Sequence, residues 1–304
     1  MKKVIQSAIN VSTALDEVVE EMVQSLSALP SLLVADYSSD LDHNRSVITL
    51  LGNEVSLEEA VIRIFQVASA RLDISHHTGE HPRIGAVDVV PFTPWRGSSM
   101  EECQRLAWRV GERVAKEFGV PVYFYAEASR VPEHRDLSWL RRGGYEALRE
   151  EIDKVPGRQP DLGPLELHPT LGAVAIGARG PLVAFNVNLD TGDLEVAKYI
   201  ARKLRGDQGG LRYVKAIGVN LRSRGLVQVS MNLLDFRKSA LYQALELVKL
   251  EAQRFGVCVK GAEIIGLVPL EALVDVASFY LGIPELKSTQ VLEYHLLSLD
   301  EAES

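Results

Sequence analysis

The sequence has few cysteines and no long apolar run, and each absence excludes a class of protein. Only Cys103 and Cys258 occur in 304 residues, and both lie inside apolar helix or strand patterns. Two distant thiols do not make the framework of a small disulfide-stabilised secreted domain. No segment reaches about 18 consecutive apolar residues, and the first residues lack the apolar core of a signal peptide. We therefore expect a cytoplasmic protein with reduced thiols and no membrane partner.

Positive charge is also scarce, with 33 Lys and Arg against 41 Asp and Glu and a formal net charge of −8. Non-specific binding to nucleic acid depends on Lys and Arg that neutralise phosphates, so this balance argues against a nucleic-acid partner. It does not exclude a local basic pocket for a small anion. The 46% apolar and 24% charged fractions are those of an ordinary globular protein, and the length is typical of about two domains.

Apolar periodicity predicts similar element orders in the two halves of the chain. The first half reads β-α-β-β-α-β-α-β, and the core of the second half reads β-α-β-β-α-β, the ferredoxin-like order. We therefore expect an α+β fold with two ferredoxin-like subdomains, residues 1–180 and 181–304, packed side by side. A ligand is expected in a cleft between them, because pockets favour domain interfaces. Ser56 is expected to cap the second helix, with Glu59 completing a capping box. A polar loop is expected over residues 39–45, and Gly119 is expected to end the helix of residues 100–119.

The segment from Arg130 to Gly180 differs from the rest because it is rich in proline and glycine. It contains one helical stretch, residues 143–152, within a connection that we expect to be partly irregular. Long Pro/Gly-rich loops in compact proteins are more often functional or linking than idle. We expect Gly163–Gly172, with the sequence GPLELHPTLG, to be an ordered loop.

Three of the seven histidines lie in the stretch HHTGEHPR, residues 76–83. A metal site is one interpretation, since His77 and His81 are four residues apart, but Gly79 and Pro82 disfavour the helix that would align them. A polar turn is a second interpretation. A third is an acid–base site, in which Glu80 orients the ring of His81 or holds its charge.

The strand pattern GAVDVVPF, residues 85–92, follows this stretch and contains one charge. Strict alternation would place Ala86, Asp88 and Val90 on one face. A lone buried carboxylate is usually paired or functional, and Arg83 is the expected partner of Asp88. The pairing could serve structure or catalysis.

The run H-x-G-E-H-P-R-x-G-A-x-D-V-x-P-F, from His77 to Phe92, resembles the signature of the formiminotransferase domain family. Further matching stretches are DHNRS, VPVYFY, PDLGP, AFNVNL, QVSMNLLDF and GLVPLEAL, in order and at matching spacing over most of the chain. The resemblance implies a stand-alone enzyme that transfers a formimidoyl group between N5 of tetrahydrofolate and the amino group of L-glutamate. It also implies histidine catabolism, one-carbon metabolism and a homodimer, with folate as co-substrate and no metal.

The same resemblance assigns the catalytic histidine to His81, as general base and then general acid. Asp88 and Glu80 are expected to stabilise the cationic amidine during transfer. Arg45 and Arg83 suit the carboxylates of glutamate or folate, with Arg179 a weaker candidate. His76 and His77 are expected to shape the pocket. The folate-binding stretch falls on Gly163, Pro164, Leu165, Glu166, Leu167, His168, Pro169, Thr170, Leu171 and Gly172.

The N-terminal turn departs from the family pattern P-N-F-S-E-G. Here it reads INVSTA, which keeps Asn10 and Ser12 and lacks the Pro, Glu and Gly. Formyl transfer is a neighbouring hypothesis to formimidoyl transfer, because the two transferred groups differ by one heteroatom. A non-catalytic folate- or pterin-binding protein is an alternative function, and a metallohydrolase that uses His76, His77 and His81 is a third.

Overall fold

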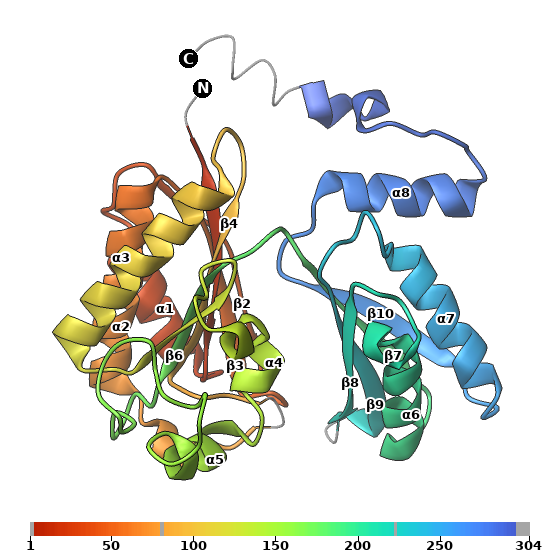
Figure 1. Cartoon of the computed structure of the whole chain (residues 1–304). Helices are drawn as coiled ribbons and strands as arrows, with labels where there is room; N and C mark the ends of the chain where they lie inside the picture. The colour runs from red at the N-terminus through yellow and green to blue at the C-terminus, as the bar shows by residue number, and fades with distance from the viewer. Residues whose placement is uncertain (1–2, 80–81, 222–223, 296–304) are drawn as a thin grey trace. The chain divides into compact units, whose positions relative to one another are not determined.

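The computed structural model describes residues 3–79, 82–221 and 224–295, and the chain divides into two compact units (Figure 1). The first unit runs to Gly180, and the second begins at Pro181. Each unit has its own sheet and its own apolar core. No helix in these described ranges is long and apolar enough to cross a bilayer. The predicted α+β class is confirmed.

The first unit is built on a six-stranded mixed sheet. In chain order its elements are β1 (Ile5–Val11), α1 (Asp16–Leu26), β2 (Leu32–Asp40), β3 (Arg45–Gly52), α2 (Glu54–Arg71), β4 (Val87–Pro94), α3 (Met100–Phe118), β5 (Val122–Ala126), α4 (Leu137–Leu140), α5 (Gly144–Glu151) and β6 (Val174–Ala178). The strand order is β2-β3-β1-β4-β6-β5. The first four strands are antiparallel and, with α1 and α2, have the ferredoxin-like arrangement. Strands β6 and β5 extend the sheet in parallel with β4.

Helices α1, α2 and α3 cover one face of this sheet (Figure 1). Their apolar stripes bury Met22, Phe65 and Val110, among others, against the sheet. Helix α3 begins with a capping box between Ser99 and Glu102 and ends at Gly119, whose φ of 66° is left-handed. This helix therefore ends at the predicted glycine.

A second apolar cluster lies on the other side of the sheet. Val89, Tyr123 and Tyr125 of the strands pack there with Leu140 and Leu148, from the end of α4 and from α5. The Pro/Gly-rich connection is therefore folded against the sheet rather than detached from it. This packing also holds Arg141, the residue after α4, beside Asp88 at the start of β4.

Three local expectations were wrong. The connection contains an unpredicted strand, β6, whose five buried residues are too few to show a period between the flanking glycines. Helix α2 begins at Glu54, and its cap is Asn53, whose side chain accepts a hydrogen bond from Ser56 N at 2.9 Å. Ser56 thus lies inside the helix. The polar loop expected over residues 39–45 is shorter, because both flanking strands extend into it.

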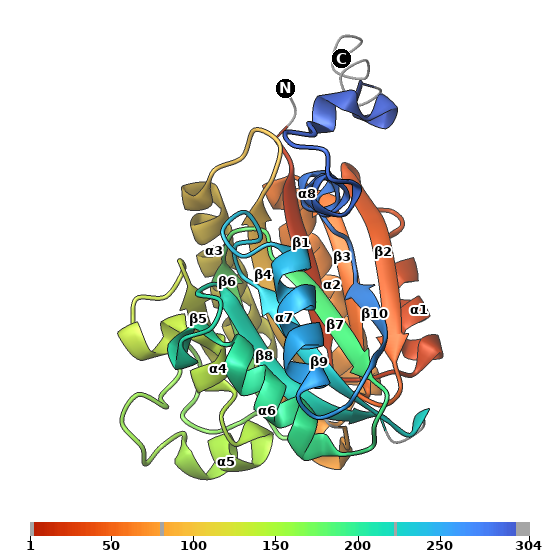
Figure 2. The same ribbon diagram turned by 90° about the vertical axis from the view of Figure 1, so that its right-hand side faces the viewer.

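The second unit has the ferredoxin-like order throughout. Its elements are β7 (Val183–Leu189), α6 (Leu194–Leu204), β8 (Val214–Leu221), β9 (Leu226–Leu233), α7 (Leu241–Gln253), β10 (Val259–Ile265) and α8 (Leu270–Leu281). The sheet order is β10-β7-β9-β8, and every pairing is antiparallel. Helices α6 and α7 lie over one face (Figure 2). They bury alternate strand residues such as Phe185 and Val229, so the intervening residues belong to the opposite face.

Gly85, just before β4, provides a test of the backbone packing that positions the site. A Cβ there would lie 1.8 Å from the Ala173 carbonyl oxygen and 2.7 Å from that of Leu171. We expect Gly85→Ala to lower the free energy of unfolding by about 1–3 kcal/mol, because backbone must move to accept the methyl group. Gly180→Ala is the control, since its Cβ would meet nothing within 4 Å. Urea denaturation measures both, and equal stability of the two variants would contradict the packing.

Candidate functional site

Three segments that are distant in sequence join at the start of β4. Ile74 N donates to Thr170 O at 2.8 Å, Ala86 N to Leu171 O at 2.9 Å, and Ala173 N to Ile84 O at 2.9 Å. These backbone bonds tie residues on both sides of the histidine-rich stretch to the predicted loop 163–172 and to Ala173, which follows it. The structure therefore brings together two segments that the sequence assigned to one site.

The N-terminal turn also contacts the residues at the start of β4 and β3, through Ser12 and Asn10, the two residues that it shares with the family pattern. Ser12 Oγ donates to Gly85 O at 2.7 Å, and Ser12 N donates to Ala86 O at 2.8 Å. Asn10 Oδ1 accepts a hydrogen bond from Arg45 Nε at 2.9 Å. The residues that remain from the family's opening turn thus contact the site.

Asp88 is almost fully buried, with 2% of its side chain exposed, and it is held by three groups. Its Oδ1 accepts from Ile84 N at 2.9 Å, and its Oδ2 forms an ion pair with Arg141. Arg45 Nη1 lies 3.9 Å from the same Oδ2. A buried carboxylate needs such partners, because desolvation otherwise costs several kcal/mol.

The expected pairing of Asp88 with Arg83 was wrong, as was its shared face with Ala86 and Val90. Ala86 and Val90 pack in the three-helix core, whereas Asp88 meets the arginines. The register of β1 against β4 shifts at this point, so that Asn10 pairs with Val89 and Val11 with Val87. Such a bulge interrupts the alternation of faces.

Arg83 pairs instead with Glu146 of α5. Its Nη2 lies 2.8 Å from Glu146 Oε1 and 2.9 Å from His77 O, and 13% of its side chain is exposed. The Nε atoms of Arg83 and Arg141 are both buried and have no hydrogen-bond partner among the described residues. Two buried cationic donors without an acceptor suit an added carboxylate or similar anion.

Positive charge is concentrated around Asp88 although the chain as a whole is acidic. Burial and then repulsion from Arg141 lower the pKa of Arg45 to about 9, against attraction from Asp88. Burial raises the pKa of Tyr125, while nearby Arg179 and Arg141 lower it in part. An anion bound here would reduce the repulsion between the guanidinium groups.

The two histidines that the structure describes here differ in environment. His76 is exposed, with Asp73 at 3.8 Å. His77 is half-buried, and its Nε2 lies 2.8 Å from Asn44 O, so Nε2 carries the proton and Nδ1 the lone pair. Burial lowers the pKa of His77, which favours the neutral form of the ring. Glu80 and His81, the other predicted site residues of this stretch, lie outside the described residues.

The predicted folate-binding loop is ordered by its own contacts. His168 and Gly172 exchange two backbone hydrogen bonds of 3.0 and 2.9 Å. His168 Nδ1 also accepts from Leu171 N at 3.0 Å, and burial lowers the pKa of this ring. Leu171 is buried, whereas Leu165 is exposed. One end of the loop is therefore anchored in the site, and Leu165 remains accessible.

Sequence reasoning missed Arg141 and the residue that fixes it, Arg158. Arg158 is 1% exposed, and its guanidinium donates to the carbonyl oxygens of Trp139, Leu140 and Arg142 at 2.7–3.1 Å. It thereby fixes the backbone on both sides of Arg141. No sequence pattern connects position 141 or 158 with Asp88, because both arginines lie in the connection that has no readable period.

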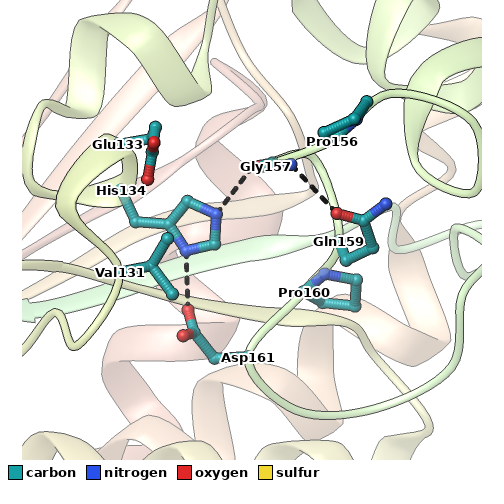
Figure 3. Close-up of a pocket in the computed structure, with 8 residues that line it drawn as sticks. All are labelled: Val131, Glu133, His134, Pro156, Gly157, Gln159, Pro160 and Asp161. Atoms are coloured by element: carbon teal, nitrogen blue, oxygen red, sulfur yellow. Dashed lines mark hydrogen bonds and ion pairs between the residues drawn. The ribbon is translucent and has the colours of Figure 1, made fainter.

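A hollow of about 460 Å³ lies elsewhere in the first unit, beside His134 (Figure 3). The ring of His134 is 1% exposed, with Nδ1 3.0 Å from Asp161 Oδ2 and Nε2 2.8 Å from Gly157 O. Both neighbours are acceptors, so both ring nitrogens carry protons. Asp161 also accepts from Phe124 N at 2.7 Å, so this pair ties the connection to β5.

No group of three or more His, Cys, Asp or Glu side chains is arranged to hold a metal ion in the described part of the chain. The described site residues themselves offer arginine, imidazole and buried carboxylate groups. Arginine donors recognise carboxylates, and an imidazole moves protons near neutral pH.

The fold places the chain in the class of α+β proteins built from two ferredoxin-like units. In the first unit, the histidine and arginine segments are joined to an ordered loop. Comparison with known families identifies the family to which it belongs. The profile of the formiminotransferase domain, N-terminal subdomain, matches residues 4–179, and that of the formiminotransferase domain matches residues 184–298. The chain belongs to the formiminotransferase domain family, as its sequence motifs indicated.

Individual relatives cover most of the chain. A glutamate formimidoyltransferase of Streptococcus pyogenes serotype M1 is 43% identical over 299 residues, 98% of this chain and 100% of the relative. One from Thermoplasma acidophilum is 42% identical over 90% of this chain and 91% of its own length. A formimidoyltransferase-cyclodeaminase of Mus musculus is 42% identical over 87% of this chain and 50% of that protein.

The His134–Asp161 pair predicts a pH-dependent stability. Burial alone would lower the pKa of His134, but its hydrogen bonds to Asp161 and Gly157 raise it above the ordinary 6.5. The stabilisation that protonated His134 gives the folded state is therefore complete below pH 6.5, the pKa of this histidine in the unfolded chain. It is lost as the pH rises through the higher pKa of the folded state. We expect the unfolding free energy of the wild type to decline there, and that of His134→Gln to decline less. Parallel curves for the two proteins, measured by urea denaturation at each pH, would exclude this role.

Proposed function

We propose that this chain transfers a formimidoyl group between N5 of tetrahydrofolate and the amino group of L-glutamate. The observation that carries the proposal is the 42–43% identity, over 90–98% of the chain, with two proteins named glutamate formimidoyltransferase. The local chemistry supports it, because both substrates carry carboxylates and the site presents buried arginine donors.

His81 is the proton carrier in this proposal. The glutamate ammonium must lose a proton before its nitrogen attacks the formimidoyl carbon, and N5 must gain one as it leaves. A single imidazole can accept the first proton and deliver the second, which is worth about 10²–10⁴ in rate. We place Glu80 beside His81 as the group that orients its ring or holds its charge.

The arginines and Asp88 have complementary roles. We propose that Arg83 and Arg45 bind the substrate carboxylates, with Arg141 as a third donor that the sequence did not indicate. Asp88 holds Arg141 and Arg45 in position through the contacts described above, and its charge stabilises the cationic amidine. The loop Gly163–Gly172 binds the folate, which is the carrier of the transferred group.

The same family resemblance extends to the setting of the reaction. We propose a cytoplasmic homodimer that acts in histidine catabolism and one-carbon metabolism, with residues 1–180 and 181–304 as its two formiminotransferase subdomains. Formyl transfer and folate binding without turnover are the competing functions. Incubation with 5-formimidoyltetrahydrofolate or 5-formyltetrahydrofolate, with and without glutamate, distinguishes them by the absorbance of released tetrahydrofolate.

The role of His81 is tested against that of His77, whose Nδ1 is the other available lone pair. We expect His81→Ala to lower kcat by about 10²–10⁴-fold, because the imidazole proposed to accept the ammonium proton and to protonate N5 is then lost. His77→Ala should have a smaller effect, and His295→Ala, in the second unit, none. Steady-state kinetics with both substrates gives the comparison. If His77→Ala loses turnover and His81→Ala retains it, the role of proton carrier belongs to His77 instead of His81.

A further inference from the structure

A polar network lies on the sheet of the second unit, on the face opposite α6 and α7. Gln228 of β9 donates from Nε2 to Asn188 Oδ1 at 2.8 Å and to Glu263 Oε1 at 2.7 Å. Asn186 of β7 donates to the same Glu263 oxygen at 3.4 Å. These residues alternate with the core residues Phe185, Val187 and Val229, which places them on the face away from the helices.

The network has too many acceptors for its donors. Gln228 is 1% exposed, and its Oε1 is buried without a hydrogen-bond partner. This orientation of the amide is required, because its NH2 group faces two acceptor oxygens. Among the described residues, Glu263 receives only these amide donors and forms no ion pair, and both bonds go to Oε1. An unsatisfied buried acceptor beside a carboxylate is costly unless a ligand supplies the donors.

We infer that Glu263 and Gln228 bind an edge of the substrate that presents N–H donors on an N–C–N group. A carboxylate accepts two parallel N–H bonds from such a group, as it does from guanidinium, and the free Gln228 carbonyl accepts a third. This inference rests on the proposed function, in which two substrates carry such an edge. One is the 2-amino-pyrimidinone ring of the folate, and the other is the amidine of N-formimidoyl-L-glutamate.

The first experiment measures binding to the full chain. We expect Glu263→Gln to weaken either 5-formyltetrahydrofolate or N-formimidoyl-L-glutamate by about 10- to 100-fold in isothermal titration calorimetry, since a charge-assisted acceptor is lost. The ligand that weakens identifies which substrate supplies the edge. Glu195→Gln, exposed on α6 over the other face, is the matched control and should bind both as the wild type does. Wild-type affinity of Glu263→Gln for both ligands would overturn the inference.

A second experiment varies the ligand, and its comparison on the wild type needs no substitution. A folate analogue with methyl in place of the 2-amino group should bind the wild type about 10- to 100-fold more weakly than its parent, if the folate supplies the edge, and Glu263→Gln should discriminate less. If the wild type and Glu263→Gln discriminate equally between the parent folate and its methyl analogue, the folate does not supply the edge that Glu263 binds. Wild-type turnover with 5-formimidoyltetrahydrofolate and glutamate is measured alongside. Its absence would refute the proposed function, whereas the binding comparison separately decides the role of Glu263.

Discussion

The buried carboxylate of Asp88 is the constraint on which the rest of the site depends. It accepts hydrogen bonds only, and it lies where water is excluded, so the fold must bring cations and a backbone amide to it. Arg45 comes from the start of β3, and Arg141 from the end of α4. One charge thus joins the ferredoxin-like part of the sheet to the Pro/Gly-rich connection that follows it.

The connection contributes to the site because it is itself held in place. Arg158 fixes the carbonyl groups around Arg141, and the His134–Asp161 pair ties the same segment to β5. At the start of β4, the close approach of Gly85 to the backbone of Ala173 joins the loop to the strand. The second unit holds a network of its own, in which Gln228 donates to Asn188 and Glu263.

Much of the fold follows from patterns that the sequence displays. Helix α3 has its capping box and terminal glycine, and the second unit's strands alternate clearly enough to predict their order. Strand β6 was missed because five consecutively buried residues have no period. The histidine stretch and the loop were identified through motifs. Arg141 was not, because an ion pair across 53 residues leaves no local signal, and the bulge at Asp88 changed the face that alternation predicts.

The most direct test of this account is a double-mutant cycle between Asp88 and Arg141, followed by urea denaturation. We predict that Asp88→Asn lowers the free energy of unfolding by about 3–5 kcal/mol, because two buried guanidinium groups lose their counter-charge. Arg141→Gln in the Asp88→Asn background should then cost much less than in the wild type, giving a coupling energy of at least about 1 kcal/mol. Additive effects, or a cost below about 0.5 kcal/mol for Asp88→Asn, would contradict the central role of this carboxylate.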